Sequence, residues 1–143
     1  NYIPHINIVY NDNDNINPFL DSGITFLKKG ISYSDNFENV YKSEILVDFV
    51  NGKHLGLSFR IFDAIGLGKK IITTNPEVLK YDFYNANNFF VLNDNNSNEL
   101  EDFLNMPYIE PPKHIKLKYG FSNWLHYVLN YGEFQTISLP NSN

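Results

Sequence analysis

The chain has 143 residues, of which 43% are hydrophobic and 16% aromatic, a composition typical of a folded globular domain. Its net charge of −5 and the absence of a basic run argue against a nucleic-acid partner. The chain contains no cysteine, which excludes disulfides and thiolate metal sites, and no apolar run reaches the roughly 18 residues that a bilayer-spanning helix needs.

The first third of the chain predicts two short strands and one helix. Residues 5–10 (HINIVY) and 24–28 (ITFLK) are rich in β-branched and aromatic residues, which favours strands. The polar run at 11–15 (NDNDN) predicts a turn between them. Residues 34–43 place apolar side chains at helical spacing, with Ser34 as the expected N-cap.

The segment 45–75 carries the strongest pattern. Residues 45–50 (ILVDFV) form a nearly continuous apolar run, as expected of a strand buried in a parallel sheet. Ser58 is the expected N-cap of a helix that runs through Ile65, and Gly66 and Gly68 are expected to end it. Residues 70–74 then return to the sheet. The whole is a βαβ unit of about 30 residues with a right-handed crossover.

The start of this helix predicts a phosphate site. A loop containing Gly56 leads into backbone N–H groups at Leu57, Ser58 and Phe59, and the helix dipole favours an anion there. In open α/β sheets, ligands bind beyond the carboxyl ends of the strands, which is where this loop is expected.

Two charges on the helix extend the prediction to a nucleotide. Arg60 and Asp63 are three residues apart and share one side, while Leu57, Ile61, Ala64 and Ile65 are expected to cover the sheet. Arg60 suits a diphosphate and Asp63 suits ribose hydroxyls. The alternative is an i,i+3 ion pair on a solvated surface. Lys69 and Lys70, after the helix, are expected to stabilise its C-terminal dipole.

The segment 56–75 (GLSFRIFDAIGLGKKIITTN) resembles the GL(S/T)xRxFEALGxGKKxITTN segment of bacterial GT-B glycosyltransferases. The most similar are lipopolysaccharide and capsule transferases and CgeB-like spore-maturation proteins. The YDFY at 81–84 is also similar, and the resemblance covers roughly 24–129. Two departures are that the usual Glu is Asp63 here, and that Leu55 interrupts the paired-glutamate pattern of the best-known members.

The resemblance implies a Rossmann-like, three-layer α/β domain with a mainly parallel sheet, the C-terminal half of a GT-B fold. Residues 1–131 would form this nucleotide-sugar (donor) domain and 132–143 a C-terminal tail, expected to be frayed over 135–143. The acceptor domain is expected in an N-terminal part that this chain does not contain. The fragment alone is expected to bind donor weakly and to catalyse nothing.

The implied reaction moves a sugar from a nucleotide diphospho-sugar to a glycan or glycolipid acceptor in lipopolysaccharide or capsule biosynthesis. Arg60 and the helix N–H groups would stabilise the leaving diphosphate, so that no metal or other cofactor is required. The expected location is the cytoplasm or the inner face of the cytoplasmic membrane, by peripheral association and without a transmembrane segment.

Further candidate contacts lie on neighbouring loops. Thr74 and Asn75 follow the second strand of the unit and are expected to contact the donor, with Asn75 also capping a short helix that begins at Pro76. Residues 30–33 resemble the GT-B stretch that lines the base pocket, which implies that the backbone of Ile31 and Ser32 could contact the nucleobase. The alternative, which the residues favour, is an ordinary connection between a strand and a helix. Lys53 and His54, in the loop after residue 50, are candidates for neutralising diphosphate or assisting the leaving group, although a lone histidine in a polar loop is more often simply exposed.

The last part of the chain predicts a strand, two helices and an extended linker. Residues 89–93 (FFVLN) suit a buried strand, and Ser97 or Asn98 is expected to cap an acidic helix at 99–105. Prolines at 107, 111 and 112 indicate an extended segment. Residues 122–131 form an amphipathic helix with an aromatic side that is expected to be partly uncovered.

Two other functions remain open from the residues alone. One is a non-catalytic nucleotide-binding module, in which Asp63 reports lost activity. The other is a metal-dependent transferase of the GT-A type, because Asp12 and Asp14 form a DxD pattern after a strand.

Overall fold

The computed structural model describes residues 3–19, 22–50 and 56–138, and the chain divides into two compact units, 1–39 and 40–143. The single donor domain expected over 1–131 stays a prediction, because the two units are described separately. Loop residues Lys53, His54 and Leu55 lie outside the described residues.

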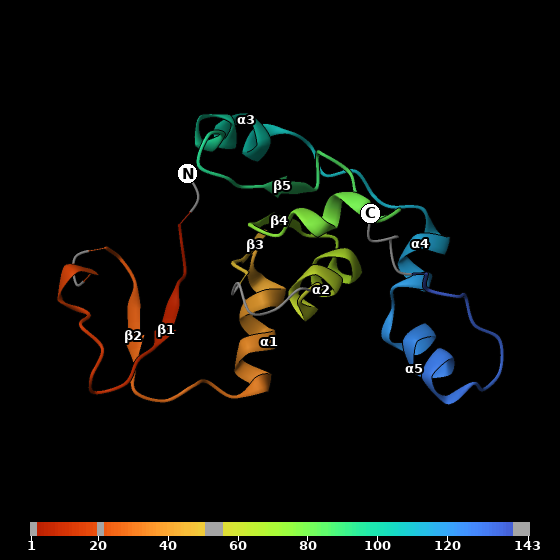
Figure 1. The fold of residues 1–143 in the computed structure, drawn as a ribbon, viewed down its shortest axis with the longest axis horizontal. Helices are drawn as coiled ribbons and strands as arrows, with labels where there is room; N and C mark the ends of the chain where they lie inside the picture. Colours follow the sequence, from red (N-terminus) through yellow and green to blue (C-terminus); the bar gives the residue numbers. More distant parts are fainter. Residues whose placement is uncertain (1–2, 20–21, 51–55, 139–143) are drawn as a thin grey trace. The chain divides into compact units, whose positions relative to one another are not determined.

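The first unit holds two short strands that pair in parallel, β1 (Asn7–Val9) and β2 (Thr25–Leu27), inside the two segments predicted as strands. A short 3-10 helix, η1 (Asn17–Phe19), lies between them in the chain (Figure 1). The predicted turn is present, since the backbone N–H of Asp14 donates to the carbonyl of Asn11 at 3.0 Å.

Helix α1 (Tyr33–Lys42) begins one residue earlier than the predicted range. The expectation that Ser34 caps it was wrong, because Ser34 lies inside the first turn. Ser32 acts as the cap instead: its Oγ accepts a hydrogen bond from the backbone N–H of Asp35 at 3.1 Å and donates to the Asp35 carboxylate at 2.7 Å. A residue three positions before Asp35 is the one that can reach that N–H group.

The second unit is built on three parallel strands in the order β3 (Ile45–Asp48), β4 (Lys70–Thr73) and β5 (Phe89–Val91). Helix α2 (Phe59–Leu67) connects β3 to β4, which confirms the predicted βαβ unit (Figure 1). The fold class is therefore α/β with parallel sheets, as expected of a Rossmann-like domain.

Helix α2 begins after Ser58 and ends at Gly68, as the sequence predicted. Ser58 has an extended backbone before the first turn, and Gly68 ends the helix with a left-handed φ of 66°. The N–H of Lys69 then closes on the carbonyl of Ala64 at 2.9 Å. Gly66 was also expected to end the helix, but it lies within the last turn.

The core lies between α2 and one face of the sheet. Ile61, Ala64 and Ile65 are buried, as the spacing predicted, and Leu57 packs against them half-buried. The side chains that complete this core come from strands, from helix α1, from helix α4 (Lys113–Lys118) and from connecting segments: Val40, Leu46, Ile71, Val78, Phe83, Phe89, Ile115 and Tyr119. Burying such apolar side chains supplies about 1.5–3 kcal/mol each, so this face holds the unit together.

The other face of the sheet is partly covered. Helix α3 (Leu100–Asn105) places Phe103 on Phe90, with 5.3 Å between the ring centroids. At the opposite edge of the sheet Val47 is 42% exposed.

Of the two caps predicted in the second half of the chain, one is confirmed and one is wrong. Asn75 caps the short helix η2 (Pro76–Lys80) as predicted, accepting from the N–H of Glu77 at 3.0 Å. The acidic helix, however, begins as a 3-10 turn, η3 (Ser97–Glu99), so Ser97 and Asn98 lie inside it and neither caps it.

Helix α4 was not predicted, because the prolines before it indicated only a linker. The last helix, α5 (Phe121–Leu129), matches its prediction closely. The expected frayed tail is anchored at its start, since the N–H of Gln135 donates to Asn123 Oδ1 at 2.6 Å.

Lys69 and Lys70 were expected to act on the end of α2, but they reach other helices. Lys69 Nζ donates to the carbonyl of Tyr41 in α1 at 2.9 Å, and Lys70 Nζ donates to the carbonyl of Met106 after α3 at 2.8 Å. The expectation for α2 was therefore wrong, because both ammonium groups meet the C-terminal carbonyls of other helices.

Candidate functional site

A buried carboxylate joins the carboxyl ends of β3 and β4 to the start of α2. Asp48, the last residue of β3, is 8% exposed. Its Oδ1 accepts a hydrogen bond from Ser58 Oγ at 2.7 Å, and its Oδ2 accepts one from Thr73 Oγ1 at 3.0 Å. The two strand ends and the helix start are therefore held at one place by a charge-assisted network.

Sequence reasoning missed Asp48. The signal was present, because it is the one charged residue in the apolar run 45–50, at the end of a buried strand. A carboxylate in such a position needs partners, and hydroxyl-bearing residues are its closest candidates.

The loop after β4 is fixed by its own polar groups. Thr73 Oγ1 accepts from the N–H of Asn75 at 3.0 Å, and the buried Asn75 amide donates to the carbonyl of Gly56 at 3.2 Å. Because Asn75 also caps η2, its side-chain oxygen and nitrogen both have protein partners. Asn75 therefore holds the Gly56 loop against β4, a positioning role for a residue that was predicted to contact donor.

The Thr74 hydroxyl has hydrogen-bonding capacity beyond its described partner. Its N–H donates to the carbonyl of Asp48 at 3.1 Å, and its hydroxyl accepts from the N–H of Val50 at 2.9 Å. The hydroxyl proton and a second lone pair remain for a ligand. Thr74 also lines the groove described below.

The first turn of α2 has no side-chain cap. The Ser58 hydroxyl, which would ordinarily accept from an N–H of that turn, donates to Asp48 instead. The N-terminal N–H groups are thus left without the usual side-chain acceptor at the carboxyl end of the sheet. A Cβ added at Gly56 would meet no described atom within 4 Å, so the space beside Gly56 is open as far as the described residues go.

Arg60 and Asp63 lie on α2 as predicted, and both are half-buried. Among the described residues the pair makes no ion pair within 4.0 Å, so the simple i,i+3 salt bridge is not what the structure shows. Burial raises the pKa of Asp63, and the positive charge of Arg60 opposes that rise. Asp63 is thus a half-buried carboxylate without a described hydrogen-bond partner, and it can accept hydrogen bonds from a ligand.

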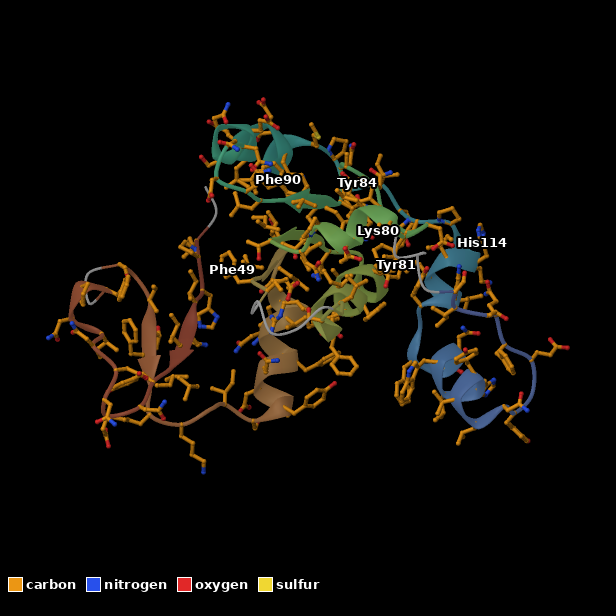
Figure 2. The ribbon with its side chains drawn as sticks, viewed as in Figure 1. Phe49, Lys80, Tyr81, Tyr84, Phe90 and His114 are labelled. Carbon is orange, nitrogen blue, oxygen red and sulfur yellow. The ribbon has the colours of Figure 1, made fainter. Side chains whose placement is uncertain are left out.

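A groove of about 790 Å³ opens beside the ends of β4 and β5. It runs between η2, β5 and α3, and Tyr84 and Phe90 from its lining are labelled in Figure 2. Polar groups stand among the apolar ones, with Thr74, Asn93 and Asn96 near the strand ends. The groove therefore offers an aromatic surface and hydrogen-bonding side chains next to the network of Asp48.

The other predicted residues belong to the first unit. Ile31 and Ser32 belong to the first unit, whose position relative to the network is not described, and the Ser32 hydroxyl caps α1. The carboxylate of Asp12 pairs with Lys28, and that of Asp14 accepts from the N–H of Asn11 at 2.7 Å. Over the described residues, no three His, Asp or Glu side chains gather closely enough to hold a metal ion.

No family model, curated protein or solved structure matches this chain. The resemblance to GT-B glycosyltransferases therefore stays a prediction. Within residues 3–19, 22–50 and 56–138, none of the helices has both the length and the apolar character needed to cross a membrane.

Proposed function

We propose that this chain is the donor-binding domain of a glycosyltransferase that moves a sugar from a nucleotide diphospho-sugar to a surface-glycan acceptor. The observation that carries the proposal is the bond from Ser58 to Asp48, which fixes the uncapped start of α2 at the carboxyl ends of β3 and β4. That is the position in an α/β sheet where a diphosphate gains most from backbone N–H groups and the helix dipole.

Different residues of α2 bind different parts of the nucleotide. The diphosphate lies at the N–H groups of the first turn, with Arg60 as the cation that neutralises it. Asp63, half-buried and without a described partner, accepts hydrogen bonds from ribose hydroxyls. The groove that begins at Thr74 receives a further part of the donor against its aromatic lining. Stabilising the leaving diphosphate in this way needs no metal ion.

The acceptor and the residue that activates it belong to a domain outside this chain, and the reaction takes place between the two. The acceptor class is a glycan or glycolipid of the lipopolysaccharide or capsule type, at the inner face of the cytoplasmic membrane. These parts of the proposal rest on the resemblance of the segment 56–75.

Calorimetric titration of the 143-residue chain with UDP, GDP, ADP and CMP, with and without EDTA, tests the proposal. We expect millimolar or tighter binding of one nucleoside diphosphate, unchanged by EDTA. Arg60→Ala should weaken binding at least tenfold, which corresponds to about 1.4 kcal/mol. The matched control is Lys113→Ala, which removes an exposed lysine on α4 and should leave the affinity unchanged.

Two outcomes would contradict the proposal. If none of the four nucleotides binds the folded chain, the donor site is not here. If EDTA abolishes binding, and an Asp12→Ala variant does the same, a metal-dependent site of the GT-A type is favoured instead.

A further inference from the structure

One wall of the groove beside β5 carries negative charge. The turn η3 and helix α3 present a single face to the groove, because their lining residues follow i, i+3, i+4, i+7 spacing: Glu99, Asp102, Phe103 and Met106. Glu99 and Asp102 are exposed, and their carboxylates have no described partner. Because no Lys, Arg or His is among the lining residues, the groove holds two carboxylates and no cation.

The buried cation of this region lies at the other end of α3. Lys70 is 7% exposed, and its Nζ donates to the carbonyl of Met106 at 2.8 Å. Glu99 and Asp102, by contrast, stand at the start of α3, after the loop that leaves the carboxyl end of β5. The negative part of the wall is therefore the part that begins at the strand ends.

The floor of the groove is the outer edge of β5. This strand is at one edge of the three-stranded sheet, and all of residues 89–93 line the groove. The carbonyl of Asn88 and the N–H of Leu92 bond to β4, each at 2.8 Å. Because the backbone of a parallel strand alternates, the N–H and C=O groups of Phe89 and Val91 point away from β4 and towards the groove.

Two of these four outward groups have partners and two do not. The Phe89 N–H donates to the carbonyl of Asn85 at 2.9 Å, and the Val91 carbonyl accepts from the Asn96 amide at 2.9 Å. Asn96 Oδ1 also accepts from the N–H of Asn93 at 2.9 Å, so this side chain blocks the addition of a further strand along the edge. The Val91 N–H and the Phe89 carbonyl have no described partner.

These groups suit a small ligand that both donates and accepts hydrogen bonds and has an apolar face. A hydroxyl group does both, so it can bond to the Val91 N–H or to the Phe89 carbonyl. Tyr84 and Phe90, labelled in Figure 2, supply aromatic rings in the same groove. A sugar ring has hydroxyl groups at its rim and C–H groups on its faces, which matches an apolar groove with a few polar groups.

We propose that the groove binds the sugar of the donor and that Glu99 and Asp102 select against an acidic sugar. A uronic acid is rejected, because its carboxylate meets two like charges without a cation in the lining. A protonated amino sugar is bound best, because the same carboxylates pair with its ammonium group. This inference rests on the proposed function, which identifies the ligand as a sugar donor.

Three sugar phosphates test the inference without requiring the base of the nucleotide. Glucosamine 1-phosphate, glucose 1-phosphate and glucuronate 1-phosphate share a hexose ring and an anomeric phosphate and differ in the charge on the sugar. Ligand-observed NMR titration of the 143-residue chain, in the presence of EDTA, measures their affinities against inorganic phosphate. We expect glucosamine 1-phosphate to bind about threefold more tightly than glucose 1-phosphate, and glucuronate 1-phosphate to bind about threefold more weakly.

A charge reversal provides the sharper test. Asp102→Lys should invert the order, so that glucuronate 1-phosphate binds more tightly than glucosamine 1-phosphate. The matched control is Glu101→Lys, which makes the same change of charge in the same turn of α3 at a residue that does not line the groove. It should keep the parent order. Asp102→Asn, which should reduce the preference for the amino sugar, serves as the second variant if urea unfolding shows that Asp102→Lys is not folded.

Three results would overturn the inference: equal affinities for the three sugar phosphates, affinities no higher than that of inorganic phosphate, or an inverted order in Glu101→Lys as well. Titration of the parent with nucleoside diphosphates separates this inference from the proposed function. Nucleotide binding without discrimination among the sugar phosphates would refute the role of the groove alone. The expected order of sugar phosphates without nucleotide binding would refute the proposed nucleotide site and leave the groove as a sugar site.

Discussion

The ammonium group of Lys70 on β4 lies 2.8 Å from the carbonyl oxygen of Met106, immediately after α3. It also donates to the carbonyl of Phe103, whose ring centroid is 4.2 Å from Nζ. The last carbonyls of a helix have no intrahelical donor, so a cation at this point satisfies them. Burial lowers the pKa of Lys70, and the side chain ties the central strand to the end of α3.

Replacing the ammonium group of Lys70 should destabilise the fold without changing the binding of a ligand. Lys70→Met keeps the apolar stem and removes the donor, and we expect it to lower the free energy of unfolding by about 1–3 kcal/mol. The adjacent control is Lys69→Met, whose half-exposed side chain makes one such bond, to Tyr41. Its cost should stay within about 0.5 kcal/mol. Urea unfolding measures the free energy of unfolding of the two variants. Equal losses in both would contradict the conclusion that Lys70 ties β4 to the end of α3.

Removing the carboxylate of Asp48 should affect both stability and nucleotide binding. In Asp48→Ala the hydroxyls of Ser58 and Thr73 lose their common acceptor, and we expect a cost of about 1–3 kcal/mol in the free energy of unfolding. Because Ser58 then loses the hydrogen bond that holds the start of α2 at the strand ends, affinity for a nucleoside diphosphate should also fall. Urea unfolding and calorimetric titration of the same preparation give both quantities.

The control for Asp48 is Asp94→Ala, which removes an exposed carboxylate from a loop. It should change neither measurement. An Asp48→Ala variant that is destabilised but binds with the parent affinity would show that the network supports the fold and not the site.

The sequence was sufficient for most of the elements and insufficient for their polar contacts. The apolar run at 45–50, the spacing of Ile61, Ala64 and Ile65, and the left-handed position of Gly68 all follow from local chemistry, and the structure confirms them. Helix α4 was not predicted, because its six residues are stabilised by burying Ile115 in the core. No local sequence pattern indicates such a tertiary contact.

The site predicted on the segment 56–75 did not include Asp48, which bonds to Ser58 of that segment. Asp48 and Thr73 are 25 residues apart, and their contact depends on the register of β3 with β4. Asn75 was expected to contact the donor, which stays a prediction, and its bond to Gly56 shows that it also positions the loop. Such partners cannot be read from one segment, because they are assigned by the pairing of strands that are distant in the chain.

Asp63→Asn should separate stability from binding. Burial raises the pKa of Asp63, so the folded state holds its proton more tightly than the unfolded chain does. A raised carboxyl pKa means that stability falls as the pH rises through the titration range, and that the ionised group is unfavourable to the fold at pH 7. The neutral amide should therefore leave the free energy of unfolding at pH 7 unchanged or higher.

The same variant should weaken nucleoside diphosphate binding, because an amide is a poorer acceptor for ribose hydroxyls than a carboxylate. Thermal unfolding and titration at pH 7 provide the comparison. A variant that loses stability and keeps its affinity would assign Asp63 to the fold.

Asp82 should make the fold sensitive to acid. Partial burial by itself would raise the pKa of Asp82, but hydrogen bonds from Lys118 Nζ at 2.7 Å and Tyr119 Oη at 2.6 Å outweigh it and hold the pKa below its usual range. With a depressed folded pKa, the stabilisation is present above the unfolded value of 3.8 and is lost as the pH falls through the folded value. The parent chain should therefore lose stability below a pH of about 4.

Urea unfolding between pH 3 and pH 7 measures this loss in the parent and in Asp82→Asn. The variant has no carboxyl group to titrate at this position, so its stability should start lower at pH 7 and fall less steeply towards pH 3. Asp94→Asn removes an exposed carboxylate as a control and should keep the parent slope. Because Tyr119 packs edge-to-face on Phe83 with 4.9 Å between centroids, losing its bond to Asp82 also loosens α4 against the core. A parent and variant with the same acid slope would mean that other carboxylates, and not this contact, govern the acid response.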